Sequence, residues 1–250
     1  MKISIITAVF NNEKTVARAL QSIDQQVYKN IEHIIVDGKS DDKSCDIIKK
    51  FINHNNIFIS ESDNGIYDAL NKGLSFATGD IVAFLHADDL YADKFSLSRV
   101  VEIFQDKKVD IVYGDASYFD GDETSKVVRK YKSNKLTKKN LAWGKMPVHP
   151  SIFIKKSIYE QFGSFRTEFK IAGDYDFLCR IINYDDLSSY YEPRVFVLMQ
   201  RGGVSTTRTL KNTIILNKEI LNAIKDNNIY TNIFMVLSRY FFKIQQFIRK

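Results

Sequence analysis

The first half of the chain alternates β-rich, largely apolar runs with amphipathic segments. The runs lack the polar alternation of a half-exposed strand, as expected for strands buried on both faces of a sheet. They cover residues 3–9, 31–36, 56–59 and 80–85. The segments between them have helical spacing, with Asn11 or Asn12 as the expected N-cap of the first helix and Asp42 among the expected caps of the second. The pattern predicts an α/β fold with a mostly parallel sheet covered by helices, whose ligands bind beyond the carboxyl ends of the strands.

The second half of the chain has a mixed pattern. Further strands are predicted over residues 109–113, 116–119, 126–131 and 194–199. Residues 143–150 fit neither periodicity and are predicted to form an ordered loop, whereas Gly173 and Asp174 open a helix over residues 175–182. After Gly203 the chain is predicted to be helical to its end.

The last part of this helical region is amphipathic. Apolar residues recur at helical spacing from Tyr230 to Ile248, with Arg239 and Lys243 among them. Such a helix can lie in a membrane interface and bring the protein to a lipid surface. Its apolar face can equally pack on the rest of the fold, and the sequence leaves both alternatives open.

Composition narrows the class of protein. The 250 residues are 44% hydrophobic and 26% charged, and 36 basic against 30 acidic residues leave a mild net charge of +6. The basic excess lies late in the chain rather than in one nucleic-acid-like block, so we expect no nucleic-acid partner. Cys45 and Cys179 have neither zinc-site nor disulfide spacing. Because there is no signal-peptide pattern and no apolar run of about 18 residues, the expected location is the cytoplasm.

Polar clusters follow the predicted strands of the first half. They are Thr7 to Asn12, Asp37 to Asp42, Glu61 to Asp68, and the pair Asp88 and Asp89. A parallel sheet would bring these clusters to one edge. Carboxylates there can accept a base imide or a ribose hydroxyl, whereas a diphosphate needs a cation between itself and the acids. The Asp88 and Asp89 pair therefore indicates a metal-diphosphate clamp, and the alternative is a solvated acidic turn that caps the next helix.

Five ordered motifs give the chain a resemblance to a known family. They are Ile5 to Asn12, Val36 to Asp42, Asn71 to Gly73, Ala77 to Asp80 and Leu85 to Asp89. Together they resemble family two glycosyltransferases with the GT-A fold, over about the first 100 residues. Residues 60–73 are similar to a bacterial subgroup that builds O-antigen, capsule or exopolysaccharide repeat units.

This resemblance implies an architecture for the whole chain. A Rossmann-like GT-A catalytic domain would span residues 1–205, with a nucleotide-sugar half (1–105) and an acceptor half (106–205). A helical C-terminal extension would occupy residues 206–250.

On the donor side, the resemblance implies contacts with the uridine, the ribose and the phosphates. The residues that would make them are Thr7, Glu13, Asp37, Asp68, Lys72, Asp88 and Arg201. The first three would hold the uridine, the next three the ribose and diphosphate, and the arginine the donor phosphates. Asp89 would bind Mn2+ or Mg2+. His86 occupies the first position of the usual acid-any-acid pattern, which leaves Asp89, diphosphate oxygens and water as the implied metal shell.

On the acceptor side, Asp174 stands where the family carries its catalytic base, with Gly173 in place of the more usual glutamate. An inverting transfer needs such a base to deprotonate the acceptor hydroxyl. Asp174 can also cap the helix that follows, and the two roles are compatible. Asp176 is the substitute base. His149 and Trp143 are expected to contact the acceptor, although a structural role is an equal alternative for each.

The resemblance thus implies an inverting, non-processive, metal-dependent glycosyltransferase. It would move one hexose, galactose or glucose, from a UDP-sugar in β linkage to a saccharide on undecaprenyl diphosphate. The reaction would serve O-antigen or other surface polysaccharide synthesis at the inner face of the bacterial cell membrane, with peripheral membrane contact. The alternatives are a sugar nucleotidyltransferase and a non-catalytic nucleotide-sugar or glycan-binding module. Residues 7–12 contain no glycine, unlike the Gly-rich loop of a nucleotidyltransferase.

Overall fold

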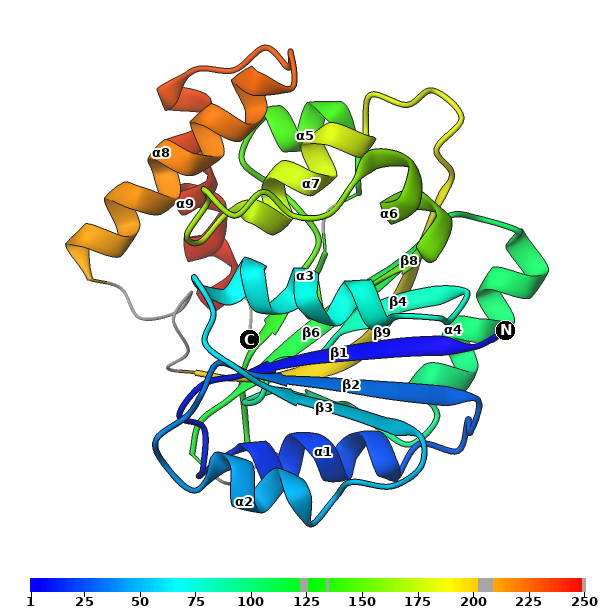
Figure 1. Ribbon diagram of the computed structural model, residues 1–250. Helices are drawn as coiled ribbons and strands as arrows, with labels where there is room; N and C mark the ends of the chain where they lie inside the picture. The colour runs from blue at the N-terminus through cyan, green and yellow to red at the C-terminus, as the bar shows by residue number, and fades with distance from the viewer. Residues whose placement is uncertain (122–125, 134, 202–208, 249–250) are drawn as a thin grey trace.

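One mixed β-sheet forms the centre of the molecule (Figure 1). The computed structural model describes the backbone of residues 1–121, 126–133, 135–201 and 209–248, with side chains as far as residue 241. Within these residues the strand order is β3-β2-β1-β4-β8-β6-β9-β5, with β7 beside β6. The strands are β1 (Ile3–Val9), β2 (Ile31–Asp37), β3 (Asn56–Ser60), β4 (Ile81–Phe84), β5 (Leu90–Tyr91), β6 (Ile111–Phe119), β7 (Val127–Tyr131), β8 (Ile152–Lys155) and β9 (Ser189–Gln200).

Helices cover both faces of this sheet (Figure 1). Successive residues of a strand point to opposite faces, so Ile5 packs with Leu97 on one face and Ile6 with Leu70 on the other. The first face carries α1 (Val16–Asp24), α2 (Ser44–Lys49) and α4 (Ser96–Lys107). The second carries α3 (Ile66–Phe76), α5 (Lys138–Ala142), α6 (Lys156–Phe162), α7 (Gly173–Ile181), α8 (Leu210–Asp226) and α9 (Ile233–Ile248).

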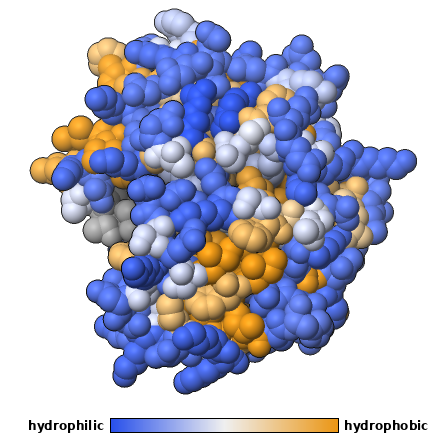
Figure 2. Space-filling model, in the orientation of Figure 1, coloured by the Kyte–Doolittle hydropathy of each residue, from blue (hydrophilic) through white to orange (hydrophobic). Residues whose placement is uncertain are grey.

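The first half of the fold follows the predicted pattern. β1 pairs in parallel with β2 and β4, β2 pairs in parallel with β3, and the strand positions agree with the prediction to within one or two residues. β3 is an open edge whose apolar side chains are only partly buried, and Figure 2 shows an apolar patch at this position. The expected caps of α1 are wrong, because α1 begins only at Val16 and the Asn12 side chain accepts the N–H of Phe10 instead. At the start of α2 the N-cap is Lys43 rather than a predicted cap residue, although the Asp42 carboxylate just before it accepts the N–H of Ser44.

The second half departs from the predicted boundaries. Residues 109–113 and 116–119 belong to one strand, β6, which passes through Gly114 without a break. A Cβ at Gly114 would lie 2.4 Å from the Phe196 ring and 2.7 Å from the carbonyl oxygen of Arg194, so glycine is what lets β9 approach β6. β8 lies antiparallel between β4 and β6 and joins the two halves of the sheet. That strand and α4, α5 and α6 have no counterpart among the predicted elements.

The C-terminal region is a helical hairpin rather than one continuous helix. α8 and α9 are separated by a turn in which Asn228 has a positive φ of 56°. Ile220, Ala223 and Val236 are buried in the core above the sheet, so the hairpin packs on the domain and only part of its surface faces solvent. No helix in the described ranges is long and apolar enough to cross a membrane. The predicted boundary at residue 205 falls outside the described residues.

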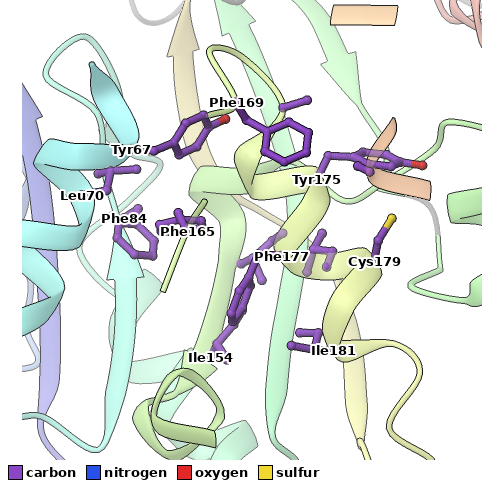
Figure 3. Close-up of a cluster of buried hydrophobic side chains, with 14 of the residues drawn as sticks. Tyr67, Leu70, Phe84, Ile154, Phe165, Phe169, Tyr175, Phe177, Cys179 and Ile181 are labelled. Carbon is purple, nitrogen blue, oxygen red and sulfur yellow. The ribbon is translucent and has the colours of Figure 1, made fainter. Parts of the chain in front are cut away.

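An aromatic-rich part of the core lies between α3, the sheet and α7 (Figure 3). Phe84 and Phe165 pack edge to face at 5.3 Å between ring centroids, and Tyr159 and Phe177 stack at 4.5 Å. Such pairs add about 0.5–1.5 kcal/mol each beyond the area that they bury. This packing fixes the start of α7, where Asp174 lies.

Candidate active site

Several of the segments that carry predicted site residues meet at the carboxyl edge of the parallel strands. β1 and β2 end side by side, with Val9 opposite Asp37. β4 runs parallel to β1 and delivers residues 85–89 to the same edge, on the left of Figure 1. The convergence expected from the alternating pattern is therefore confirmed for these segments.

Asp37 is a buried carboxylate held by donors of its own chain. Ser40 donates through its hydroxyl (2.5 Å) and its N–H (3.1 Å), and Ser60 donates through its hydroxyl (2.7 Å). Cys45 Sγ lies 3.1 Å from Asp37 Oδ2. Burial raises the pKa of Asp37, but these donors outweigh burial and hold the pKa below its usual value. Asp37 is therefore an ionised and rigid acceptor at the end of β2.

The two other residues expected at the uridine lie in different surroundings. Thr7 is fully buried within β1, and its hydroxyl oxygen is 2.9 Å from His33 Nε2. Glu13 lies at the edge, where its carboxylate accepts the N–H of Lys43 (3.2 Å) and its own N–H donates to Asp42 (2.9 Å). Contact of either side chain with a donor stays a prediction, and only Glu13 presents its carboxylate at the edge.

Lys72 and Asp68 lie one turn apart on α3. Lys72 Nζ is 3.0 Å from Glu61 Oε1 and 3.6 Å from Asp68 Oδ2, and it donates to the carbonyl oxygen of Ser62 at 2.7 Å. Hydrogen bonding to Glu61, followed by the charge of Asp68, raises the pKa of Lys72. The ammonium group is therefore charged, and a donor phosphate would share it with these two acids.

Asp89 is the most unusual carboxylate at this edge. Its side chain is 2% exposed, and its Oδ2 atom has no hydrogen-bond partner. Burial, followed by the charge of Asp88, raises the pKa of Asp89 well above its usual range, against an opposing hydrogen bond from the backbone of Gln200. A buried carboxylate oxygen without a partner is costly. A hard cation would satisfy it directly.

Two histidines connect the acid pair to the interior of the site. The rings of His86 and His149 are 5.8 Å apart between centroids, and His149 stacks on Phe84 at 5.1 Å. Burial, followed by the neighbouring His86, lowers the pKa of His149 to about 3. Burial also lowers the pKa of His86, against the opposing charge of Asp88. His149 is therefore neutral at physiological pH and keeps one nitrogen lone pair that can accept a hydrogen bond or bind a cation.

Asp174 shares a small pocket with His149 at the start of α7. The pocket is lined by Phe84, His149, Ile152, Ile154, Tyr159, Phe165, Asp174, Phe177 and Leu178. Asp174 Oδ1 accepts the N–H of Tyr175 at 2.8 Å and lies 3.0 Å from the Tyr67 hydroxyl. Burial raises the pKa of Asp174 to about 6, against the opposing donors Tyr175 and Tyr67. Such a carboxylate is ionised at pH 7 and still basic enough to accept a proton.

Tyr67 is a positioning residue that the sequence did not single out for function. It comes from α3, and its hydroxyl reaches the loop before α7 (Figure 3), 2.7 Å from the carbonyl oxygen of Ile171. Its single proton is shared between that oxygen and Asp174. The Tyr67 ring also lies against Gly173, where a Cβ would come within 2.9 Å of the ring. The glutamate that the family usually carries at this position has no room here.

Tyr67→Phe is expected to move the acidic limb of the pH–rate profile to higher pH. The tyrosine hydroxyl stabilises the charged form of Asp174, so its loss raises the pKa of the carboxyl. A hydrogen bond to a charged group contributes about 1.5 kcal/mol, and because the proton is shared we expect a shift of roughly half a pH unit. Profiles of kcat for wild type and variant test this, and Tyr184→Phe is the control. If the acidic limb of the Tyr67→Phe profile stays at the wild-type pH, Tyr67 does not stabilise the charged form of Asp174.

Glu219 on α8 is a second residue that sequence patterns gave no reason to select. Its carboxylate accepts three backbone N–H groups from the loop before α7, those of Lys170 (2.8 Å), Ile171 (2.9 Å) and Ala172 (2.9 Å). Three donors on one carboxylate make a strong, directional clamp. The C-terminal hairpin thereby fixes the loop that presents Asp174.

Glu219→Gln is expected to lower kcat roughly tenfold with little change in the KM for the donor. The amide nitrogen of glutamine cannot accept a hydrogen bond, so at least one loop N–H loses its partner, at a cost of about 1–3 kcal/mol. Glu160→Gln is the matched control, because Glu160 is exposed and pairs with Lys156 across the surface of α6. Wild-type kcat in Glu219→Gln would show that the clamp does not position Asp174.

Three predicted site residues lie in structural or peripheral surroundings. Asp176 is fully buried and is bound by Arg166 (3.4 Å), Arg180 (3.4 Å) and Asn227 (3.0 Å), so it joins α7 to the end of α8 and gives no support to an acceptor contact. Trp143 follows α5 and packs on the core. Arg201, at the end of β9, is exposed and pairs with Asp120 at 2.9 Å. The loop after Arg201 lies outside the described residues.

The fold is an α/β fold with acids at the carboxyl ends of its parallel strands, the edge at which enzymes of this architecture bind their ligands. Residues 4–163 match Glycosyl transferase family 2, and because this match spans more than half of the chain, the protein belongs to that family and is a glycosyltransferase. Family membership favours sugar transfer over the nucleotidyltransferase and binding-module alternatives.

Curated relatives agree with this assignment. A PGL/p-HBAD biosynthesis glycosyltransferase of Mycobacterium bovis is 29% identical over 233 residues, which cover 87% of this chain and 82% of the relative. An uncharacterized glycosyltransferase of Mycobacterium tuberculosis is 30% identical over 181 residues, covering 71% of this chain and 68% of the relative. These relatives are mycobacterial, and they do not identify the O-antigen or capsule subgroup suggested by residues 60–73.

Solved structures support the GT-A fold. Residues 1–349 of S. aureus TarS match with a TM-score of 0.71 at 19% identity, over 96% of this chain and 72% of that chain, whereas this chain spans 40% of the longer TarS structure. A TarS complex contains UDP-GlcNAc. The mannosyltransferase PcManGT from Pyrobaculum calidifontis, in complex with GDP-Man and Mn2+, matches with a TM-score of 0.67 at 20% identity, over 92% of this chain and 65% of that chain.

Proposed function

We propose that this glycosyltransferase moves one sugar from a UDP-sugar to a hydroxyl of a lipid-linked saccharide, with inversion of the anomeric centre. The observation that carries the proposal is the position of Asp174. It is a partly exposed carboxylate with a pKa of about 6, and it lines a pocket that His149 also lines. His149 in turn neighbours His86 and the acid pair at residues 88 and 89. This chain of neighbours supports a site in which Asp174 would act as the base and the acid pair would bind the phosphates through a cation.

The donor side of the proposal rests on three acids. Asp37 is ionised but buried and already bonded by its own chain, so a contact with the nucleoside would need these donors to yield, whereas the partly exposed Asp88 would accept from the ribose. Asp89 would hold a divalent cation, Mn2+ or Mg2+, through its unpartnered buried oxygen. Among the described residues no group of three or more metal-binding side chains occurs, and in this proposal diphosphate oxygens and water would complete the shell. The cation, when bound, offsets the charge that develops on the leaving diphosphate.

The acceptor side rests on Asp174 as general base. Asp174 takes the proton of the acceptor hydroxyl while that oxygen forms a bond to the anomeric carbon. The bond from that carbon to the diphosphate oxygen breaks at the same time, and its electron pair leaves with UDP. A single displacement inverts the anomeric centre, so a UDP-α-hexose gives a β-linked product. Tyr67 and Glu219 keep Asp174 in place during this step.

The substrates are proposed by chemical class. The UDP and UDP-GlcNAc in the TarS complexes support a uridine nucleotide as donor. We extend this to galactose or glucose as the hexose, and to a saccharide on undecaprenyl diphosphate as the acceptor, in O-antigen or related surface polysaccharide synthesis at the inner membrane face. Galactose and glucose are epimers that differ in the direction of one hydroxyl, so a panel of UDP-sugars is needed to identify the donor.

A donor panel with Mn2+ and a synthetic saccharide diphospholipid tests the proposal. UDP-galactose, UDP-glucose, UDP-GlcNAc and GDP-mannose are incubated with the full chain, and both the released nucleotide and the extended lipid are measured. We expect one UDP-sugar to give equal amounts of UDP and extended lipid, with loss of both products in EDTA. Transfer from GDP-mannose alone, or metal-independent transfer, would contradict the proposal.

A further inference from the structure

The C-terminal hairpin carries an unusual share of exposed apolar surface. The five most exposed large apolar side chains of the described residues all belong to α8, α9 and the turn between them, and are 66–85% exposed: Leu210, Ile214, Tyr230, Phe234 and Phe241. By contrast, the apolar side chains of β3, at the position of the central apolar patch in Figure 2, are partly buried. Apolar atoms at the upper left of Figure 2 mark the outer side of the hairpin. A surface of this kind is typical of an interaction site.

Basic side chains flank the same hairpin. Residues 126–139 contain seven Lys and Arg and no Asp or Glu, and six of the seven are exposed. They span β7 and the start of α5. β7 packs against α9, and the end of α5 accepts a hydrogen bond, through the Ala142 carbonyl, from the Thr231 hydroxyl in the turn between α8 and α9. On α8, Lys211, Lys218 and Lys225 are exposed at intervals of seven residues, which places them along one stripe of the helix.

We propose that the five apolar side chains and the basic residues of 126–139, together called the docking face, bind an anionic lipid bilayer. Aromatic and aliphatic side chains enter the interface between headgroups and acyl chains, while flanking lysines bind anionic headgroups. A second copy of the chain fits less well, because two docking faces would bring like charges together.

The docking face is joined to the catalytic machinery through α8. This helix begins on the side of the molecule where the parallel strands end (Figure 1) and carries Glu219, which clamps the loop before Asp174. A bilayer on this face would bring a lipid-linked acceptor toward the site. The purpose given to the docking face, delivery of a lipid-linked acceptor, rests on the proposed function. Binding to vesicles does not, because it is measured without any transfer reaction.

Co-sedimentation of the full chain with vesicles tests the proposal. Vesicles of phosphatidylglycerol and phosphatidylcholine are compared with phosphatidylcholine alone, at low and high salt. The apolar variant is Phe234→Ser with Phe241→Ser, and the charge variant is Lys138→Glu with Lys139→Glu. The second pair lies in the first turn of α5, where negative charge is favourable to the helix. Phe95→Ser with Lys49→Glu, at exposed positions far from the hairpin in sequence, is the control.

We expect binding to the anionic vesicles, at least tenfold weaker binding in both variants, and weakening by salt in wild type. The control should bind as wild type, and all variants should keep transfer to a water-soluble acceptor. Undiminished binding in the Phe variant, or equal binding to both vesicle types, would overturn the proposal. So would a dimer in light scattering that the Phe variant dissociates. Vesicle binding without any sugar transfer would refute the proposed function and leave the docking face standing.

Discussion

Asp174→Asn is expected to reduce kcat by about 10²- to 10⁴-fold, the usual contribution of a general base. The asparagine side chain keeps the size of the aspartate, and its amide oxygen still accepts the N–H of Tyr175. It cannot accept the acceptor proton. UDP binding, followed by calorimetry, should stay within a few-fold of wild type, because Asp174 lies on α7 and the nucleoside contacts are proposed at Asp37 and Asp88.

The pH dependence of wild type gives a second readout of the same residue. Because the base must be deprotonated, kcat should fall below pH 6, the approximate pKa of Asp174. Asp185→Asn, a change of an exposed acid just beyond α7, is the control and should keep wild-type kcat and pH profile. Full activity in Asp174→Asn would show that Asp174 is not the catalytic base.

Asp89→Asn is expected to abolish metal-dependent transfer and to raise the thermal stability of the metal-free protein. Asp89 is buried beside Asp88, and its Oδ2 atom has no partner, so its charge opposes folding in the absence of a cation. Removal of that charge should raise Tm by roughly 2–4 °C, the change that about 1 kcal/mol produces in a chain of this size. Loss of activity together with a gain in stability is typical of a residue selected for binding rather than for folding.

Thermal shifts with added Mn2+ separate the two effects. Manganese with UDP should raise the Tm of wild type and leave that of Asp89→Asn unchanged, because binding to the folded state alone stabilises it. Asp106→Asn, an exposed acid on α4, is the control and should respond to Mn2+ as wild type does. A Tm of Asp89→Asn that falls, or that still rises with Mn2+, would contradict the assignment of Asp89.

The parts of the fold that the sequence predicts are those set by local pattern. β1 and β4 are mostly apolar and β2 contains the apolar run Ile34 to Val36, because both faces of the sheet are covered, and these runs identify the strands. β8 has the same apolar character but only four residues, and α6 follows it directly, so no turn residue marks the boundary. In the sequence, Gly114 looks like a turn residue that separates two strands. In the structure it lies inside β6, where the absence of a side chain allows β9 to approach closely.

The sequence predicts the site residues that directly follow strands. It does not predict the residues that reach the site from distant segments of the chain. Asp37, Asp88 and Asp89 come directly after apolar runs and can be located by position alone. Glu219 binds a loop 47–49 residues away, and Tyr67 contacts Asp174 across 107 residues, so neither carries a local signal. Asp176 shows the converse: its position beside Asp174 suggests catalysis, but one face of α7 turns inward and the side chain forms a buried ionic cluster.

The central claim is a single displacement in which Asp174 activates the acceptor, and the anomeric configuration of the product tests it most directly. The UDP-α-hexose that supports transfer is reacted with the saccharide diphospholipid, and the new linkage is assigned by proton NMR before any rearrangement. One displacement from the face opposite UDP predicts a β-linked product. An α-linked product would contradict the account, because it requires a double displacement or attack from the face of the leaving group.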